Sequence, residues 1–170
     1  MMQGALAGAS IAGILVSAAW FLQKAPVRVV LGGETRDEYL ARNLDYYRYY
    51  QFLETDTPAD TKVWLINMRR DTYTLDRPAV SDYLFEDWTF RKFLWESQNE
   101  QELMAKARSL GVKYALIRHD FLFDYDRSTI VDDKRTRAEN EAKLKLAKAF
   151  ILGSENTIRS DEKFSLVKVF

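Results

Sequence analysis

The sequence contains no cysteine and a single histidine, and these two scarcities exclude several kinds of site. Without cysteine there can be no disulfide framework, no thiolate nucleophile and no cysteine-ligated metal. His119 has no second imidazole at the spacing of a typical zinc site, so we expect neither a metal nor a cofactor. A cysteine-free chain suits both reducing and oxidising compartments, and its location cannot be inferred from this absence.

Other familiar signatures are also missing. The adjacent glycines Gly32 and Gly33 belong to no G-x-G-x-x-G or G-x-x-x-x-G-K phosphate-binding pattern. There is no G-x-S-x-G nucleophile elbow. The 25 Lys and Arg residues balance the 25 Asp and Glu residues, and this zero net charge excludes the basic footprint of a general nucleic-acid binder. The residues alone therefore define no catalytic mechanism, and whether the chain is an enzyme stays open.

The charged residues are unevenly distributed, since the first 23 positions contain none of them. As a helix, the segment from Met1 to Leu22 would be long enough to span about 30 Å of hydrocarbon. Small residues dominate this segment, and a spacing of four between some of them allows another helix to approach closely, as at Gly4, Gly8 and Ala12. We therefore predict a transmembrane helix at residues 1–23 that packs against other transmembrane helices.

Two other interpretations of this segment remain open. A cleaved signal peptide would need a positively charged beginning, which Met1–Gln3 does not supply beyond the terminal amine. A buried helix of a soluble protein is the third alternative. Orientation is also open, because the basic residues that follow the segment favour a cytoplasmic domain unless earlier spans set the topology.

The rest of the chain alternates predicted helices and strands, after a linker at residues 24–33. A Thr-x-x-Glu capping box at Thr35 and Glu38 predicts a helix to about Glu54, whose tyrosines we expect to pack in the core rather than to bind a sugar. Further helices are expected at residues 90–94 and 99–110, and a last one is expected to start after Asp132 and Asp133 and to run to Leu152. We expect the last of these to bury Ala142, Leu146, Ala149 and Phe150.

Almost unbroken apolar runs predict strands that are buried on both faces, at Lys62–Met68 and Val112–Ile117. An extended piece is expected at Thr72–Leu75, and a hairpin is expected to close the chain from Asn156 to Phe170. This order predicts an α/β domain at residues 34–170. Its fold would be three-layer, with a mostly parallel small sheet and a C-terminal antiparallel hairpin, preceded by the transmembrane helix.

Charged residues follow both buried strands, and ligands of open α/β sheets bind at the carboxyl ends of the strands. The candidate ligand-binding rim therefore comprises Arg69, Arg70, Asp71, Tyr73, Arg118, His119 and Asp120. Its basic groups suit an anionic sugar phosphate or a lipid head group, whereas the alternative is a solvated edge without a ligand. A His119–Asp120 pair could do acid–base work, but adjacent residues of an extended chain point to opposite faces.

Several segments carry a resemblance to a known family. They are the span Gly4–Leu22, the segment Gly33–Leu40, the tyrosine-rich helix to Tyr50, Pro58–Val63, Tyr73–Pro78, Glu102–Leu103, Leu110–Ile117 and the closing hairpin. Together they resemble the C-terminal end of integral-membrane glycosyltransferases that use polyprenyl-phosphate sugars, the protein-mannosyltransferase-like group. The resemblance implies a last membrane helix followed by an extracytoplasmic α/β domain.

In that family the catalytic carboxylates belong to a loop between the first membrane spans, so the resemblance implies no catalytic residue in this chain. It implies a non-catalytic domain that supports sugar transfer from a lipid-phosphate carrier, with membrane lipid, other transmembrane helices and a lipid-linked sugar or acceptor as partners. The alternatives are a single-span, membrane-anchored binding or interaction module without enzymatic activity, and a freestanding enzyme that uses His119 and Asp120.

Overall fold

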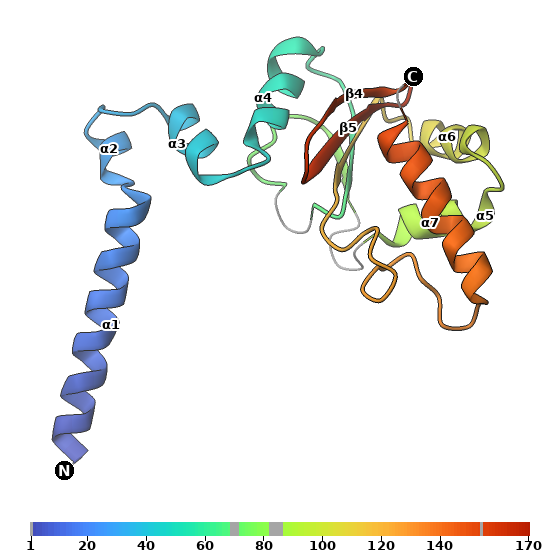
Figure 1. Ribbon diagram of the computed structural model, residues 1–170. Helices are drawn as coiled ribbons and strands as arrows, with labels where there is room; N and C mark the ends of the chain where they lie inside the picture. The colour runs from blue at the N-terminus through green and yellow to red at the C-terminus, as the bar shows by residue number, and fades with distance from the viewer. Residues whose placement is uncertain (1, 69–71, 82–86, 154) are drawn as a thin grey trace. The chain divides into compact units, whose positions relative to one another are not determined.

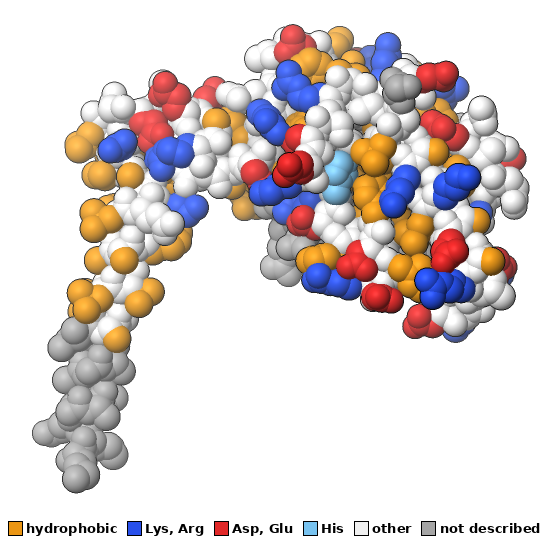
Figure 2. Space-filling model, viewed as in Figure 1, with side chains coloured by type: hydrophobic (Ala, Val, Ile, Leu, Met, Phe, Trp, Pro, Cys, Tyr) orange, Lys and Arg blue, Asp and Glu red, His pale blue; other side chains and the backbone are white. Residues whose placement is uncertain are grey.

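The computed structural model describes residues 2–68, 72–81, 87–153 and 155–170, with side chains described from residue 12 onward (Figure 1). The chain divides into two compact units, Met1–Arg48 and Tyr49–Phe170. Acidic and basic side chains are interspersed over the visible face of the second unit (Figure 2).

The first unit consists of helices. It contains α1 (Met2–Lys24), α2 (Val27–Val30), α3 (Arg36–Asn43) and the beginning of α4 (Tyr47–Asp56). The predicted capping box at the start of α3 is confirmed, because the side chains of Thr35 and Glu38 each bond the other residue's backbone N–H. The helix expected to continue to Glu54 is interrupted instead. Leu44 is extended (φ −125°, ψ 110°), and the Asn43 side-chain amide donates to the Tyr39 carbonyl at 2.9 Å.

Helix α1 covers the segment for which the sequence predicts a transmembrane helix. Among the residues that the structure describes, no helix has both the length and the apolarity needed to cross a membrane. The transmembrane part of the predicted fold is therefore not supported.

The second unit is an α/β fold around a five-stranded mixed sheet in the order β2-β1-β3-β5-β4. The strands are β1 (Val63–Ile66), β2 (Ala79–Ser81), β3 (Tyr114–Arg118), β4 (Thr157–Ser160) and β5 (Phe164–Lys168). The two predicted buried strands and the closing hairpin are confirmed. The sheet is only half parallel, because β1 pairs in parallel with β2 and β3, whereas β5 pairs antiparallel with β3 and β4.

The extended piece expected at Thr72–Leu75 is wrong in position. These residues form a turn, in which the Leu75 N–H donates to the Thr72 carbonyl at 3.3 Å. Pairing with β1 begins at Pro78, whose carbonyl accepts from the Val63 N–H at 2.9 Å, and it continues along β2.

Helices cover both faces of the sheet (Figure 1). One face packs against α5 (Trp88–Glu96), α6 (Glu100–Ser109) and α7 (Arg137–Leu152), and the core there includes Trp64, Ile66, Ala115, Ile117 and Val167. Helix α4 lies on the opposite side, where the Tyr49 ring is 5.7 Å from the Phe164 ring. The predicted packing role is confirmed for the buried tyrosines Tyr46, Tyr47, Tyr49 and Tyr50, whereas Tyr39 is only half-buried.

Helix α7 differs from its prediction at its start and in its buried face. It begins at Arg137, three residues later than expected, after a second capping box between Thr136 and Glu139. The residues that it buries are Asn140, Leu144, Ala147, Phe150 and Ile151. Asn140 can lie inside because its amide bonds the backbone of the preceding loop, accepting from the Asp132 N–H at 2.8 Å and donating to the Asp132 carbonyl at 3.1 Å. Of the four predicted inner residues, only Phe150 is fully buried.

Candidate functional site

The carboxyl ends of β1 and β3 lie at one edge of the sheet, because these strands are parallel and Ile66 is in register with Ile117. This edge is the predicted rim. Arg69, Arg70 and Asp71 fall outside the described residues. Tyr73 belongs to the turn before β2 and is 79% exposed. The described part of the rim therefore centres on Arg118, His119 and Asp120.

Arg118 and Asp120 interact with each other. The Arg118 guanidinium carbon lies 5.2 Å from the centre of the Phe164 ring, and one terminal nitrogen is 3.7 Å from an Asp120 carboxylate oxygen. His119 has different partners, as alternation along an extended chain requires. Asp120 is therefore an ion-pair partner of Arg118 and does not hydrogen-bond the imidazole in the geometry of a catalytic dyad.

His119 bridges β3 to the closing hairpin. Its Nε2 is 2.9 Å from the Ser165 hydroxyl, and its Nδ1 is 3.3 Å from the Glu162 carbonyl. A carbonyl only accepts, so a proton on Nδ1 satisfies this contact and Nε2 then accepts from Ser165. Burial lowers the pKa of His119, and the bond to the Glu162 carbonyl and the nearby charges of Asp161 and Asp120 oppose this effect only in part. The site therefore favours the neutral form of the imidazole.

A serine hydroxyl bonded to a histidine could in principle act as a nucleophile. Ser165 is fully buried, however, and its hydroxyl also lies 2.8 Å from the Ser160 hydroxyl. A substrate carbonyl cannot reach this oxygen in the present arrangement. The Ser160–Ser165–His119 contacts instead fasten the hairpin to the end of β3.

Two residues that the sequence did not single out hold the loops at this edge. Asn67 follows β1 in the left-handed region (φ 55°), and its amide donates to the carbonyls of Arg118 and Asp120 at 3.1 and 2.9 Å. Asp87 is 2% exposed, accepts from the Asn67 backbone N–H at 2.5 Å and accepts from the Thr129 hydroxyl at 3.0 Å. A buried carboxylate bonded to backbone is a strong contact, and it joins the ends of β1, α5 and the loop before α7. The signal for Asn67 was its amide side chain near the end of the apolar run Lys62–Met68.

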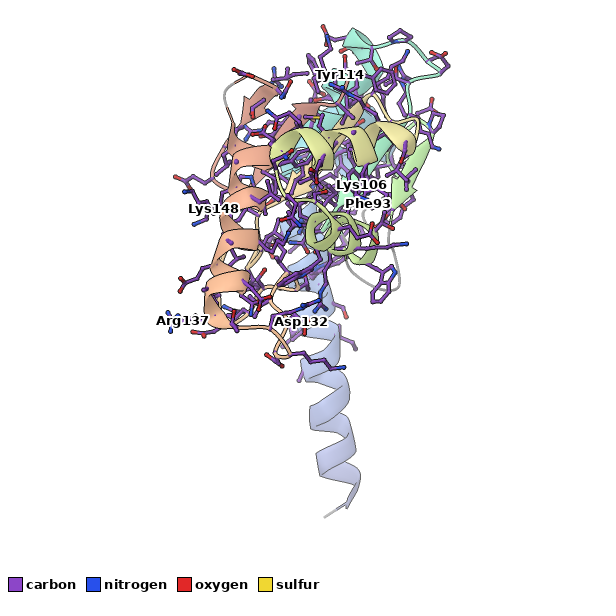
Figure 3. All side chains as sticks on the ribbon, turned by 90° about the vertical axis from the view of Figure 1, so that its right-hand side faces the viewer. Phe93, Lys106, Tyr114, Asp132, Arg137 and Lys148 are labelled. Atoms are coloured by element: carbon purple, nitrogen blue, oxygen red, sulfur yellow. The ribbon has the colours of Figure 1, made fainter. Side chains whose placement is uncertain are left out.

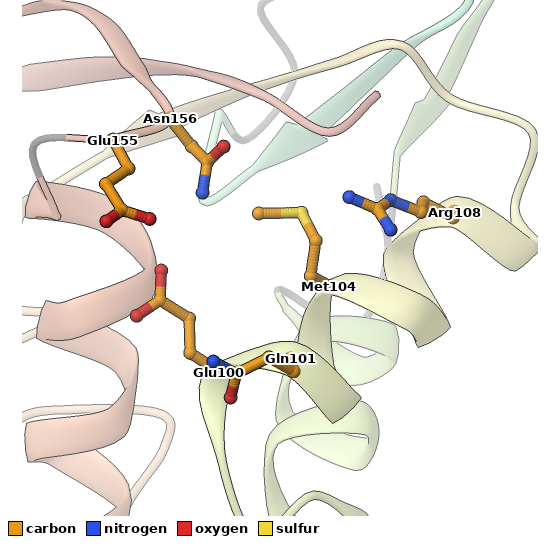
Figure 4. Close-up of a pocket in the computed structure, with 6 residues that line it drawn as sticks. All are labelled: Glu100, Gln101, Met104, Arg108, Glu155 and Asn156. Carbon is orange, nitrogen blue, oxygen red and sulfur yellow. The ribbon is translucent and has the colours of Figure 1, made fainter.

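A first hollow lies between α6 and the segment that follows α7 (Figure 4). It has a volume of about 280 Å³. In the figure the carboxylates of Glu100 and Glu155 point toward each other, and Arg108 approaches from the other side. The Arg108 side chain donates to the Val169 carbonyl at 2.8 Å, which holds the C-terminal end of the chain against α6.

A second, larger hollow runs along α5 and the loop before α7, and we call it the α5 groove. Its volume is about 510 Å³, which is within the range of small-molecule sites. Aromatic and charged side chains line it: Trp88, Arg91, Lys92, Trp95, Glu96, Asp132, Lys134 and Arg135. None of them belongs to the predicted rim, because their proximity depends on how α5 meets a loop about 40 residues away in the sequence.

Comparisons with known proteins give no further assignment. No protein-family model matches the chain, and no curated protein is significantly similar to it. Within the described ranges, no three acidic or histidine side chains are grouped to hold a metal ion. The predicted rim, the two hollows and the loop contacts of Asn67 and Asp87 are therefore the features from which a function must be argued.

Proposed function

We propose that this chain is a non-catalytic, extracytoplasmic domain of a membrane glycosyltransferase-like protein, which supports sugar transfer from a lipid-phosphate carrier. The family resemblance of the sequence supports this proposal. So does the contrast between an uncharged beginning, in which none of the first 23 residues is charged, and a second unit with charges over its visible face. In this proposal residues 1–23 are a membrane helix among other membrane helices.

One observation carries the non-catalytic part of the proposal. The single histidine of the chain uses both ring nitrogens in contacts that fasten the hairpin, and the hydroxyl bonded to it is fully buried. Arg118 and Asp120 likewise contact each other at 3.7 Å. Of the described rim residues, Arg118, His119 and Asp120 are engaged in these contacts and Tyr73 is exposed in a turn, so in this proposal the reacting groups belong to another part of the protein.

A second candidate function is a membrane-anchored binding module without enzymatic activity. The α5 groove favours it, because a hollow of about 510 Å³ with two tryptophans and four basic residues is a surface that can hold a ligand. The two candidates differ in whether sugar transfer in the cell depends on this chain.

Accessibility labelling tests the location. The natural chain contains no cysteine, so a single cysteine at exposed Lys145, introduced in the cells that produce the protein, would be a unique label site. A membrane-impermeant maleimide should react with it in intact cells. The protein should also stay in the membrane fraction after a carbonate wash.

A cysteine at Ser128 is the matched control, since this side chain is only 9% exposed and should react only after denaturation. Labelling of the Lys145 variant only after lysis, with Ser128 still protected, would refute the extracytoplasmic location. Recovery of the protein in the wash would refute the membrane helix.

A further inference from the structure

The α5 groove combines an exposed aromatic face with an excess of positive charge. Trp88 is 61% exposed, although a large apolar side chain on a soluble surface is usually better covered. The lining includes four basic residues and two acidic ones. Because the whole chain has zero net charge, this local excess is a property of the groove and not of the average surface.

Contacts with neighbouring side chains reduce the negative charge of the groove further. Glu96 accepts from Lys106, which lies outside the lining, at 2.9 Å, and this bond holds the pKa of the Glu96 carboxyl below its usual value. Asp132 lies 3.6 Å from a terminal nitrogen of Arg91. Figure 3 shows Asp132 on the segment before α7, with Arg137 at the beginning of that helix. Arg135 lies 3.8 Å from Glu139, and both side chains are about half exposed, so this pair leaves part of the guanidinium open to a ligand. The cations Lys92, Lys134 and Arg135 therefore outweigh the carboxylates of the groove lining.

Trp95 and Trp88 have different roles in this groove. The Trp95 indole N–H donates to the Ile130 carbonyl at 3.0 Å, and the guanidinium carbon of Arg135 lies 5.4 Å from the ring centre. Trp95 is thus fixed, and its ring positions Arg135 through a cation–π contact. Trp88 keeps an exposed surface on which the apolar face of a ring can stack.

A ligand that satisfies both features needs a ring with an apolar face and an attached negative charge. We propose that the α5 groove binds an anionic carbohydrate unit, a sugar bearing phosphate or carboxylate, with its ring on Trp88 and its anionic group between Lys92, Lys134 and Arg135. This inference names the class of ligand for the proposed function. Only the role of the bound sugar in sugar transfer rests on that function, and binding of the sugar to the groove can be tested independently of the proposed function.

The experiment is a titration of the purified full chain, labelled with ¹⁵N, followed through the indole N–H signals of its four tryptophans. The probes are a hexose 1-phosphate and a hexuronate, with the neutral hexose, inorganic phosphate and a short acidic peptide as comparisons. We expect saturable shifts of the Trp88 and Trp95 signals with either charged sugar and none for buried Trp64. The two charged sugars distinguish a phosphate-bearing from a carboxylate-bearing ligand.

Variants with matched controls locate the site. Trp88→Ala should weaken binding of the charged sugar about fivefold, the effect of losing about 1 kcal/mol of stacking, whereas Tyr73→Ala should not. The double variant Lys92→Glu/Lys134→Glu should weaken it about tenfold or more, whereas Lys145→Glu, an exposed lysine outside the groove, should leave it unchanged. All of these side chains are at the surface, and an unchanged thermal transition confirms that each variant folds.

Several results would overturn the inference. It fails if no charged sugar shifts the indole signals, if inorganic phosphate or the acidic peptide binds as well as the charged sugars, or if Tyr73→Ala weakens binding and Trp88→Ala does not. Such failure would leave the labelling result on location intact. Conversely, a cytoplasmic location would refute the proposed function without affecting the measured binding.

Discussion

His119 Nε2 lies 2.9 Å from the hydroxyl of Ser165, a residue 46 positions later in the chain. This contact uses the only histidine of the protein to fasten the C-terminal hairpin to β3. The same hairpin is held by the His119 backbone N–H, which donates to the Lys163 carbonyl at 2.7 Å. The side chain and the backbone of His119 therefore both join the hairpin to β3.

The stability of the protein should depend on pH through His119. Burial lowers the pKa of this imidazole from its ordinary value of 6.5, so below that pH the unfolded chain binds more protons than the folded one. The contribution of the neutral imidazole is therefore complete above about pH 7 and is lost as the pH falls through 6.5 toward the folded pKa. Urea unfolding at pH 8, 6 and 5 measures this loss.

The variant His119→Gln, which cannot titrate, is the control for this pH dependence. Carboxylates titrate in both proteins, so their effects cancel in the difference in unfolding free energy between wild type and variant. This difference should shrink as the pH falls, because only the wild type loses the contribution of the neutral imidazole. A difference that is the same at pH 8 and pH 5 would show that the imidazole is not held neutral.

Asn67 should tolerate glycine better than alanine. Asn67→Ala removes two amide hydrogen bonds. It also keeps a Cβ in the left-handed region without the short polar side chain that lets asparagine adopt this conformation, and together these losses should lower the unfolding free energy by about 3 kcal/mol. Asn67→Gly removes the same bonds without the backbone strain and should cost about 1 kcal/mol less. Equal losses in urea unfolding would mean that the φ of 55° carries no strain at this position.

The Tyr49 hydroxyl should stabilise the hairpin turn. It donates to an Asp161 carboxylate oxygen at 2.5 Å, and the other oxygen of Asp161 accepts from the Phe164 N–H at 2.9 Å. Tyr49→Phe keeps the ring contact with Phe164 and should cost about 1–2 kcal/mol, because the bond is made to a charged group. Tyr73→Phe, at an exposed tyrosine, should change stability by less than about 0.5 kcal/mol. Similar effects of both variants in thermal unfolding would contradict this role.

The capping box at Thr136 should set the beginning of α7. Thr136→Ala removes the side-chain oxygen that accepts from the Glu139 N–H and should cost about 1 kcal/mol of stability. Thr136→Ser retains the oxygen and should be close to wild type. Thermal unfolding compares the two, and a loss with serine as large as that with alanine would show that the cap does not contribute.

The sequence predicted most accurately those features that depend on neighbouring residues. The capping box at Thr35 and Glu38, the helix expected at 99–110 and the two apolar strands arise from chemistry within a few positions, and the structure contains all of them. The break between α3 and α4 was not predictable from periodicity, because the apolar spacing continues across Leu44 although its backbone is extended.

The location of the candidate site at the edge of the sheet was predictable from the sequence, but the contacts between its side chains were not. Parallel β1 and β3 do bring Asn67 and Arg118 to one edge, as the order of strands indicated. Which groups face each other there depends on β5 pairing next to β3, which places Ser165 beside His119 and Phe164 beside Arg118. The inner face of α7 was predicted wrongly for a similar reason, since a distant loop satisfies the amide of Asn140 and makes its burial possible.

The sequence by itself determined the class of fold, the positions of most helices and strands, and the exclusion of cysteine chemistry, since these follow from composition and short-range patterns. Only the tertiary structure decided that His119 is a structural contact and that Trp88 shares a groove with Lys134. The physical reason is that hydrogen bonds, burial and charge excess act between side chains close in space. The chain brings those side chains together from positions that no local pattern relates.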